Sequence, residues 1–409
     1  MSRDGSAPPA SSSTPTTASS ARPTVRLTSR TSAAPPSGAR AGMTPRLPVV
    51  SPGPGFDRAR AVVRDALGRR ICPAAVVEVG DAAGPLWREA FGSLTYDPGA
   101  APAATDTVFD LASLTKVIAT TTLVMRLSEK GRLRLDDRVA DWFPAWRGAS
   151  REDVRLQDLL AHASGLPDTR PLYEQASGRA AMERAICEMP LDYPSRSGSR
   201  YSDLGFILLG FVIEDAGRRP LAEQFSELAE SANPAWDLRY GIAGERRGRT
   251  APTQVDLWRG RLLQGEVDDR NAAALGGVAG HSGLFGTAAG VGDFARAIIA
   301  GLEGRAAASG VAAKATLSQF VRRVGTPGSS RALGWDTMLP TSSCGTRMSP
   351  TAFGHTGFTG TSLWIDAASP VYVVLLTNRV HPVAGPPEPI RELRRSLHDA
   401  VMDAVLSSG

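Results

Sequence analysis

The chain has 409 residues, with 46 lysines and arginines against 41 aspartates and glutamates, and a net charge of +5. Residues 1–55 hold six arginines and one aspartate, so the whole excess lies in this segment and the rest of the chain is balanced. A nucleic-acid-binding protein concentrates its basic charge on a folded face. The composition therefore argues against that class, and no apolar run is long enough to span a membrane.

Residues 1–55 also contain ten of the 30 prolines and 18 serines or threonines. Such a segment buries too little apolar surface to offset its ordering entropy, so we expect it to be disordered. It lacks the apolar core of a secretory signal, which favours a cytoplasmic location. An organellar transit peptide and a translation start at Met43 stay open as alternatives.

Helices and strands are predicted at both ends of the remaining chain. Apolar spacing predicts a helix over 56–70, followed by strands at 74–79 and 86–91 around a turn at 80–84. A long helix is predicted over 111–129, with its stop at Gly131. Near the C-terminus the pattern predicts strands at 361–366 and 371–377 and a helix at 388–406.

Between these ends, helical patterns dominate; they are expected at 154–160, 179–188, 204–216 and 221–229. The predicted fold class is α/β (α+β), an antiparallel sheet flanked by helices and built from both chain ends, with a helical insertion. Residues 56–140 and 330–409 would form the α/β lobe, and residues 141–329 the helical lobe. A cleft between two lobes is a common place for a ligand.

Only three lysines occur in the chain, and Lys116 follows Ser113 in an S-x-x-K tetrad. On a helix, residues i and i+3 share a face, so the Ser113 hydroxyl can reach the Lys116 amine. At a first helical turn, free backbone N–H groups also favour developing negative charge. A serine nucleophile needs both a base and an oxyanion site, so the tetrad predicts acyl transfer. A buried helix start with a structural lysine is the alternative.

The stretch Phe109–Lys116 (FDLASLTK) resembles the nucleophile helix of the β-lactamase and penicillin-binding serine hydrolases, in particular the class C β-lactamase and esterase branch. Four further motifs of that branch follow in order: LLAHASGLP at 159–167, Tyr-Ser-Asp at 201–203, GVAGHSGLF at 277–285 and His-Thr-Gly at 355–357. The resemblance covers about residues 56–405 and implies a β-lactamase/transpeptidase-like fold for residues 56–409.

This resemblance also implies roles for single residues. Ser113 would be the acylated nucleophile, Lys116 its base or proton relay, and Tyr201 the shuttle that carries a proton to the leaving group. The backbone N–H groups of Ser113 and Phe358 would form the oxyanion hole. The two triplets would line the substrate site through Asp203, His355, Thr356 and Gly357.

Two positions depart from the family pattern: Asp203 replaces the asparagine of Tyr-x-Asn, and His355 replaces the lysine of Lys-Thr-Gly. An ionised Asp203 near Lys116 would keep the lysine protonated, so we expect Tyr201, helped by a charged Lys116, to carry more of the base role. A histidine of ordinary pKa is mostly neutral at pH 7. We therefore expect neutral esters to be preferred over anionic β-lactams.

One arginine could restore anion binding. If the second hairpin turns near Ala368 and Ser369, antiparallel pairing places Arg379 beside Phe358. Arg379 could then recognise a carboxylate, with Asn378 as a neutral partner. An exposed arginine at a strand end is the alternative.

The remaining histidines and cysteines predict no metal site and no cofactor. His162 and His281 lie in Gly/Ser-rich loops, where we expect them to fix the loops by hydrogen bonds, and His381 and His398 are expected at the surface. The sequence has no H-E-x-x-H, CxxC, Walker or GxSxG pattern.

The sequence thus predicts a cofactor-free serine hydrolase with an acyl-Ser113 intermediate, acting mainly as a carboxylesterase. D-alanyl carboxypeptidase or β-lactamase activity is the alternative within the family. A penicillin-binding-like sensor or scaffold without turnover is the alternative of another class. The substrate would be a small ester, a β-lactam or a peptide, and the oligomeric state stays open.

Overall fold

The computed structural model describes residues 55–148, 151–242, 244–305 and 310–407. Residues 1–54 of the predicted tail lie outside this part of the chain. The described residues all belong to one compact unit. The division of that unit into an α/β lobe and a helical lobe stays a prediction.

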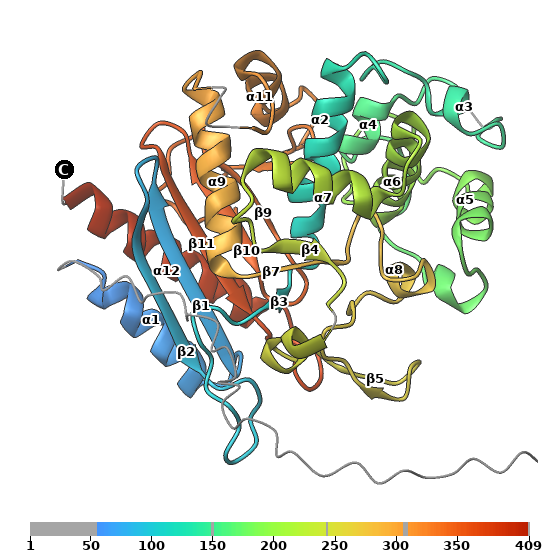
Figure 1. The fold of residues 1–409 in the computed structure, drawn as a ribbon. Helices are drawn as coiled ribbons and strands as arrows, with labels where there is room; N and C mark the ends of the chain where they lie inside the picture. Colours follow the sequence, from blue (N-terminus) through green and yellow to red (C-terminus); the bar gives the residue numbers. More distant parts are fainter. Residues whose placement is uncertain (1–54, 149–150, 243, 306–309, 408–409) are drawn as a thin grey trace, which may run out of the picture. The chain divides into compact units, whose positions relative to one another are not determined.

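A six-stranded antiparallel sheet forms the centre of the fold, in the order β2-β1-β11-β10-β9-β8 (Figure 1). The first and last parts of the chain meet where β1 pairs with β11, which confirms the prediction of a sheet built from both chain ends. Its strands are β1 (Ala74–Asp81), β2 (Pro85–Gly92), β8 (Asp336–Thr337), β9 (Phe353–Thr356), β10 (Ser362–Asp366) and β11 (Val371–Thr377).

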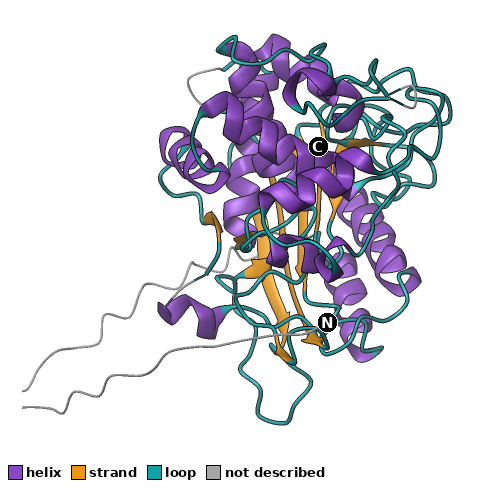
Figure 2. Ribbon diagram, turned by 90° about the vertical axis from the view of Figure 1, so that its right-hand side faces the viewer, coloured by secondary structure: helices purple, strands orange, loops and turns teal. Residues whose placement is uncertain are grey.

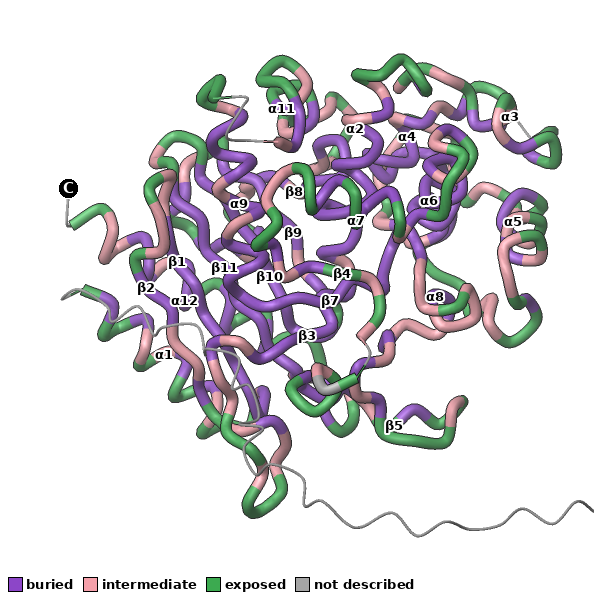
Figure 3. Tube along the Cα trace, viewed as in Figure 1, coloured by how far each residue is buried: buried purple, intermediate pink, exposed green. Residues whose placement is uncertain are grey.

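Helices cover both faces of this sheet (Figure 2). Because successive side chains of a strand point to opposite faces, β1 and β11 each serve two hydrophobic clusters. One cluster lies against α1 (Asp57–Gly68) and α12 (Glu388–Ser407) and takes Val77, Val79, Val373 and Leu375. The other lies against α9 (Ala288–Leu302) and takes Val76, Val374 and Leu376. Both strands are buried along nearly their whole length (Figure 3).

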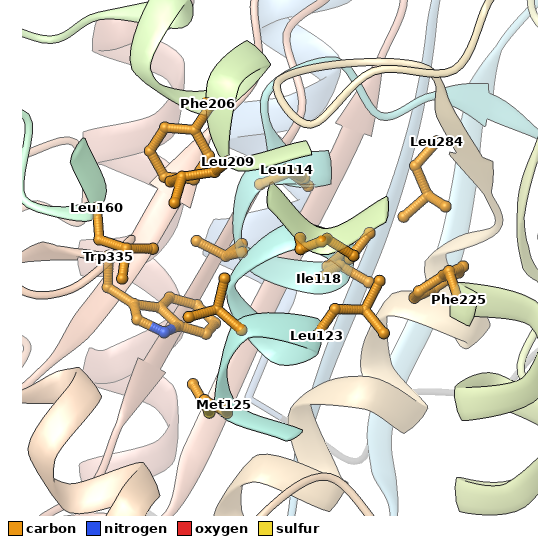
Figure 4. Close-up of a cluster of buried hydrophobic side chains, with 14 of the residues drawn as sticks. Leu114, Ile118, Leu123, Met125, Leu160, Phe206, Leu209, Phe225, Leu284 and Trp335 are labelled. Carbon is orange, nitrogen blue, oxygen red and sulfur yellow. The ribbon is translucent and has the colours of Figure 1, made fainter. Parts of the chain in front are cut away.

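The second cluster continues into the helices between the two sheet-forming parts of the chain. Leu114, Ile118 and Leu123 pack there with side chains from α6 and α7, and with Leu284 and Trp335 (Figure 4). The remaining helices of this region are α2 (Thr122–Glu129), α3 (Val139–Trp142), α4 (Leu156–Leu160), α5 (Arg179–Glu188), α6 (Asp203–Gly217), α7 (Leu221–Ala232), α8 (Arg270–Ala274) and α11 (Lys314–Val321).

Short strands and 3-10 helices complete the described elements. A small three-stranded sheet consists of β3 (Phe109–Asp110), β7 (Leu284–Gly286) and β4 (Leu238–Tyr240). A hairpin pairs β5 (Val255–Asp256) with β6 (Arg261–Leu262). The 3-10 helices span Leu172–Glu174 and Gly244–Arg249. None of the helices in the described ranges is long and apolar enough to cross a membrane.

The helix predicted over 111–129 begins later than expected. Ala112 and Ser113 form a turn, the helix begins at Leu114, and its residues Lys116–Thr121 form a π-helix that leads into α2. The delay has a local cause, because Ala112 has a left-handed φ of 48° that is incompatible with a helix. Short π-helical segments occur frequently at functional sites.

Candidate active site

Ser113 lies in the turn that joins β3 to the π-helix. Its Oγ accepts a hydrogen bond from Lys116 Nζ at 3.0 Å and another from the Tyr201 hydroxyl at 2.8 Å. Lys116 follows on the next turn of the same segment, whereas Tyr201 comes from the residues just before α6. The structure therefore brings together the three side chains that the sequence proposed as catalytic.

Lys116 is fully buried, and its ammonium group has a full set of acceptors. Besides Ser113, it donates to Asp203 Oδ1 at 2.7 Å and to the His281 carbonyl at 3.1 Å. An ammonium group has three N–H donors, so each one has a partner here. Burial lowers the pKa of Lys116, but Asp203 and Tyr201 outweigh this effect, and the net pKa lies above its ordinary value. The site thus favours a charged lysine.

Tyr201 is held as a neutral phenol. Burial raises its pKa, and the charge of Lys116 offsets this only in part. The Tyr201 ring packs on the His162 ring, with centroids 4.6 Å apart. His162 Nδ1 accepts the Ser202 N–H at 3.0 Å, so this histidine fixes the segment that carries Tyr201, as the sequence predicted for a loop-fixing residue.

The proposed oxyanion hole lies where the end of β9 meets the Ser113 turn. Thr359 Oγ1 donates to the Asp110 carbonyl at 2.8 Å, and Thr361 Oγ1 donates to the Leu111 carbonyl at 3.0 Å. A Cβ on Gly357 would lie 2.7 Å from the Leu111 carbonyl oxygen, so only glycine permits this approach. Among the described residues, the N–H groups of Ser113 and Phe358 have no protein acceptor. Both groups are therefore free to bind an oxyanion.

His355 is buried at the end of β9. Its Nδ1 contacts the Thr356 carbonyl at 2.9 Å, so the proton sits on Nδ1, and its Nε2 has no partner among the described residues. Burial, with the charges of Arg331 and Lys116, holds the pKa of His355 well below its ordinary value. His355 is therefore neutral at pH 7, a protonation state that the sequence alone left open.

Arg379 lies beside Phe358, as the hairpin register predicted. Ser362 pairs with Leu375 across β10 and β11, which is the expected alignment. The Arg379 Nε donates to the Phe358 carbonyl at 2.9 Å, and its Cζ lies 4.9 Å from the centroid of the Phe358 ring. No described carboxylate pairs with Arg379, so its charge is open to an anion at the cavity wall.

Asn378 corrects the sequence prediction, because it does not line the cavity. It is buried, and its Oδ1 accepts the Ala74 N–H at 3.2 Å. Its Nδ2 donates to the carbonyls of Leu94 and Pro252, both at 2.9 Å. Side chains alternate along an extended chain, so its neighbour Arg379 faces the cavity while Asn378 ties three backbone segments together.

A cavity of about 670 Å³ surrounds Ser113. Six arginines contribute to its lining: Arg170, Arg270, Arg331, Arg379, Arg391 and Arg394. The other polar lining includes Ser113, Tyr201, Asp203, Asp268, Asp269, Asn271, His281, His355 and Thr356. Gly357, Phe358, Tyr173 and Ile390 supply part of the less polar wall. All the predicted site residues except Asn378 and the fully buried Lys116 thus line one cavity.

Arg331 is one of several cavity residues that sequence reasoning missed, and it lies beside Tyr201. Its Cζ lies 5.3 Å from the centroid of the Tyr201 ring, and its guanidinium forms no hydrogen bond or ion pair with any described residue. Its charge lowers the pKa of both His162 and His355. Arg331 belongs to a stretch without a recognisable motif, so the sequence carried no signal for it.

The structure confirms the expectation for His281 and contradicts the expectations for His381 and His398. His281 Nε2 pairs with Asp269 Oδ1 at 2.8 Å, which confirms its loop-fixing role. His381 and His398 are both buried, so the prediction of surface positions was wrong. His398 lies on the inner face of α12, where its Nδ1 contacts the Arg394 carbonyl at 2.6 Å. In the part of the chain that is described, no three His, Cys, Asp or Glu side chains are placed to hold a metal ion.

A serine in contact with a buried lysine and a tyrosine, on an antiparallel sheet flanked by helices, defines a class of serine hydrolases. The family model named Beta-lactamase matches residues 59–396. The chain belongs to the β-lactamase family, and it is a serine hydrolase of that family.

Two relatives show the range of named activities. An Escherichia coli K12 protein named "Putative D-alanyl-D-alanine carboxypeptidase" is 31% identical over 342 residues, covering 74% of this chain and 77% of the relative. A Bacillus subtilis 168 protein named N-acetylmuramyl-L-alanine amidase is 32% identical over 315 residues, covering 69% of this chain and 71% of the relative.

Solved structures confirm the β-lactamase/transpeptidase-like fold. A class C β-lactamase from Rhodobacter sphaeroides matches with a TM-score of 0.67 at 19% identity, covering 84% of this chain and 99% of its own. EstCE1, described as a hydrolase with promiscuous acyltransferase activity, matches with a TM-score of 0.66 at 20% identity, covering 84% and 97% of the two chains.

Proposed function

We propose that the protein hydrolyses amide or ester bonds next to a carboxylate through an acyl-Ser113 intermediate, as a D-alanyl carboxypeptidase does. The observation that carries this proposal is the uncompensated charge of Arg331 beside Tyr201. Asp203, the carboxylate beside Ser113, pairs with Lys116, so its negative charge is compensated. The net charge that a substrate meets near Ser113 is thus more positive than the sequence implied.

The proposed acylation needs one proton transfer chain. Ser113 Oγ attacks the substrate carbonyl, and Tyr201 takes the serine proton while it passes a proton to the departing amine or alcohol. The carbonyl oxygen gains its charge between the N–H groups of Ser113 and Phe358. Charged Lys116 stabilises the negative charge that develops on Ser113 Oγ and on the Tyr201 oxygen during the proton transfer. A water molecule then reverses these steps, releasing the acid and restoring the Ser113 hydroxyl.

Hydrolysis of neutral esters is the second candidate. Neutral His355 and the exposed ring of Phe358 at the cavity favour substrates without charge. The fold is shared with EstCE1, but likeness at 20% identity supports the fold alone. The named carboxypeptidase and amidase relatives instead support cleavage of amide bonds.

The test compares an N-acetylated D-alanyl-D-alanine dipeptide with its C-terminal amide, alongside p-nitrophenyl acetate. We expect the free acid to have a kcat/KM about 10- to 100-fold above that of the amide, because a charge-assisted hydrogen bond contributes about 1.5–3 kcal/mol. Arg331→Gln should remove this preference and leave p-nitrophenyl acetate turnover within about twofold. Arg64→Gln, an exposed substitution on α1, is the matched control.

Other outcomes would assign a different function. Fast turnover of p-nitrophenyl esters with no cleavage of either dipeptide would favour the carboxylesterase. Labelling of Ser113 by a fluorescent penicillin without turnover of any substrate would favour a sensor. An unchanged preference in Arg331→Gln would contradict the role given to Arg331.

A further inference from the structure

Asp110 is a buried carboxylate directly beneath the nucleophile turn, and no described lysine, arginine or histidine forms an ion pair with it. Its Oδ1 accepts the Ala112 N–H at 2.8 Å, and its Oδ2 accepts the Asp268 N–H at 2.7 Å. Burying a charged group without a cation is costly. The two backbone N–H groups are thus the partners that stabilise the Asp110 carboxylate.

The first bond fixes the residue that precedes the nucleophile. Ala112 has a φ of 48°, a left-handed value that alanine seldom adopts, so the surrounding structure must hold it there. The Asp110 side chain closes this turn on the N–H two residues ahead, as aspartate commonly does. The turn directs Ser113 Oγ toward Lys116 and Tyr201 and leaves the Ser113 N–H unpaired.

The second bond reaches the segment that supports Lys116. The residue after Asp268 is Asp269, which pairs with His281, and the His281 carbonyl accepts a hydrogen bond from Lys116. The backbone carbonyl of Asp110 also accepts from Thr359, which follows Phe358. One residue therefore joins the three segments that carry the nucleophile, an acceptor of the lysine and the second oxyanion donor.

We propose that Asp110 is a positioning residue for acylation, whose carboxylate holds the Ala112–Ser113 turn and the Asp268 segment in register. This inference rests on the proposed function of Ser113 as the nucleophile. Asp110 touches neither the substrate nor the reacting atoms, so its effect falls on kcat rather than on KM.

The same carboxylate gives the role a pH signature. Burial raises the pKa of Asp110 to about 7, and Asp268 adds to this, while the N–H groups of Asp268 and Ala112 oppose it. Asp269 is the other charged group that bears on it. Phe285 pairs with Asp110 across β3 and β7, and Thr359 donates to the Asp110 backbone carbonyl; neither side chain titrates near pH 7. Protonation weakens the acceptor, so acylation should fall as the pH drops through about 7.

The experiment measures acylation by a fluorophosphonate probe and kcat and KM for p-nitrophenyl acetate from pH 5.5 to 8.5, because neither reagent needs a carboxylate anchor. In Asp110→Asn we expect kcat to fall by about 10- to 100-fold, with KM within about twofold and the step near pH 7 absent. The control is Asp366→Asn, another buried carboxylate that accepts backbone N–H groups, at the remote β10–β11 turn. It should keep the wild-type kcat and pH step.

A wild-type kcat and an unchanged pH step in Asp110→Asn would overturn the inference. If that variant does not fold, Asp110→Ser takes its place, since a serine hydroxyl can still close the turn on Ala112; retention of the step near pH 7 would then refute it. Failure of the wild-type protein to react with the probe would instead overturn the proposed function of Ser113.

Discussion

Replacing Asp203 by asparagine tests whether a charged Lys116 takes part in acylation. The amide has the size of the carboxylate and keeps an oxygen for the lysine, but it removes the negative charge 2.7 Å from Lys116 Nζ. At an effective dielectric constant of 20, two charges at that distance attract by about 6 kcal/mol. The Asp203 side chain is 19% exposed, and solvent screening reduces the interaction to about 3 kcal/mol. Loss of this attraction lowers the pKa of Lys116, because burial then acts on the ammonium group with less opposition.

The assay is the pH dependence of p-nitrophenyl acetate acylation, measured as the pre-steady-state burst in wild type and Asp203→Asn. In our account the rate needs protonated Lys116, whose pKa the wild-type site holds above its ordinary value. Wild-type acylation should therefore persist to high pH, whereas the variant should lose acylation at a lower pH than wild type does. At pH 7 the variant should be no faster than wild type.

Faster acylation by Asp203→Asn would indicate that neutral Lys116 is the base. If neutral Lys116 were the base, Asp203→Asn would acylate faster at pH 7, because more of the lysine would be deprotonated. A faster variant of unchanged thermal stability would refute the charged-lysine account. Asp366→Asn serves as the control for effects of an aspartate substitution alone.

Three further predictions concern the proton shuttle, the buried histidines and Asn378. Tyr201→Phe should slow acylation by at least about 100-fold. If this variant keeps near wild-type turnover while Lys116→Ala loses it, Tyr201 is not the proton shuttle. Burial lowers the pKa of His162, His355 and His398 in the folded state. Below about pH 6.5 the unfolded chain therefore binds more protons than the folded chain does. The free energy of unfolding should fall there by up to about 1.4 kcal/mol per pH unit for each histidine. Urea unfolding at pH 7.5, 6 and 5 measures this slope, and equal stability at all three would contradict it. Asn378→Ala should destabilise the fold by about 3 kcal/mol, because three buried backbone groups lose their partner; a raised KM at full stability would instead place Asn378 in the substrate site.

Local sequence patterns predicted the elements whose formation depends on periodicity. The strand at 371–377 and the helix at 179–188 have the predicted bounds because apolar spacing and turn residues define them locally. The hairpin register followed from the position of its turn, and it placed Arg379 beside Phe358. The late start of the helix at Leu114 was not predictable from spacing, because a side-chain bond from Asp110 and tertiary contacts hold Ala112 in its left-handed conformation.

In the site as well, residues in sequence motifs were predicted, whereas residues placed by tertiary packing were not. Ser113, Lys116 and Tyr201 were found because they stand in recognisable motifs, and their contact follows from the fold. Arg331 stands in no motif, and only the packing of its segment against the cavity brings it to Tyr201. Asn378 was misplaced because the sequence does not say which face of an extended segment points to the cavity.

The central claim is that catalysis passes through a covalent acyl-Ser113. Rapid acid quenching of the protein with p-nitrophenyl acetate or a penicillin, followed by peptide mass spectrometry, tests it directly. We expect one acyl group on the peptide that contains Ser113, and neither adduct nor turnover in Ser113→Ala. Turnover that survives in Ser113→Ala, or an adduct on another residue, would contradict the account.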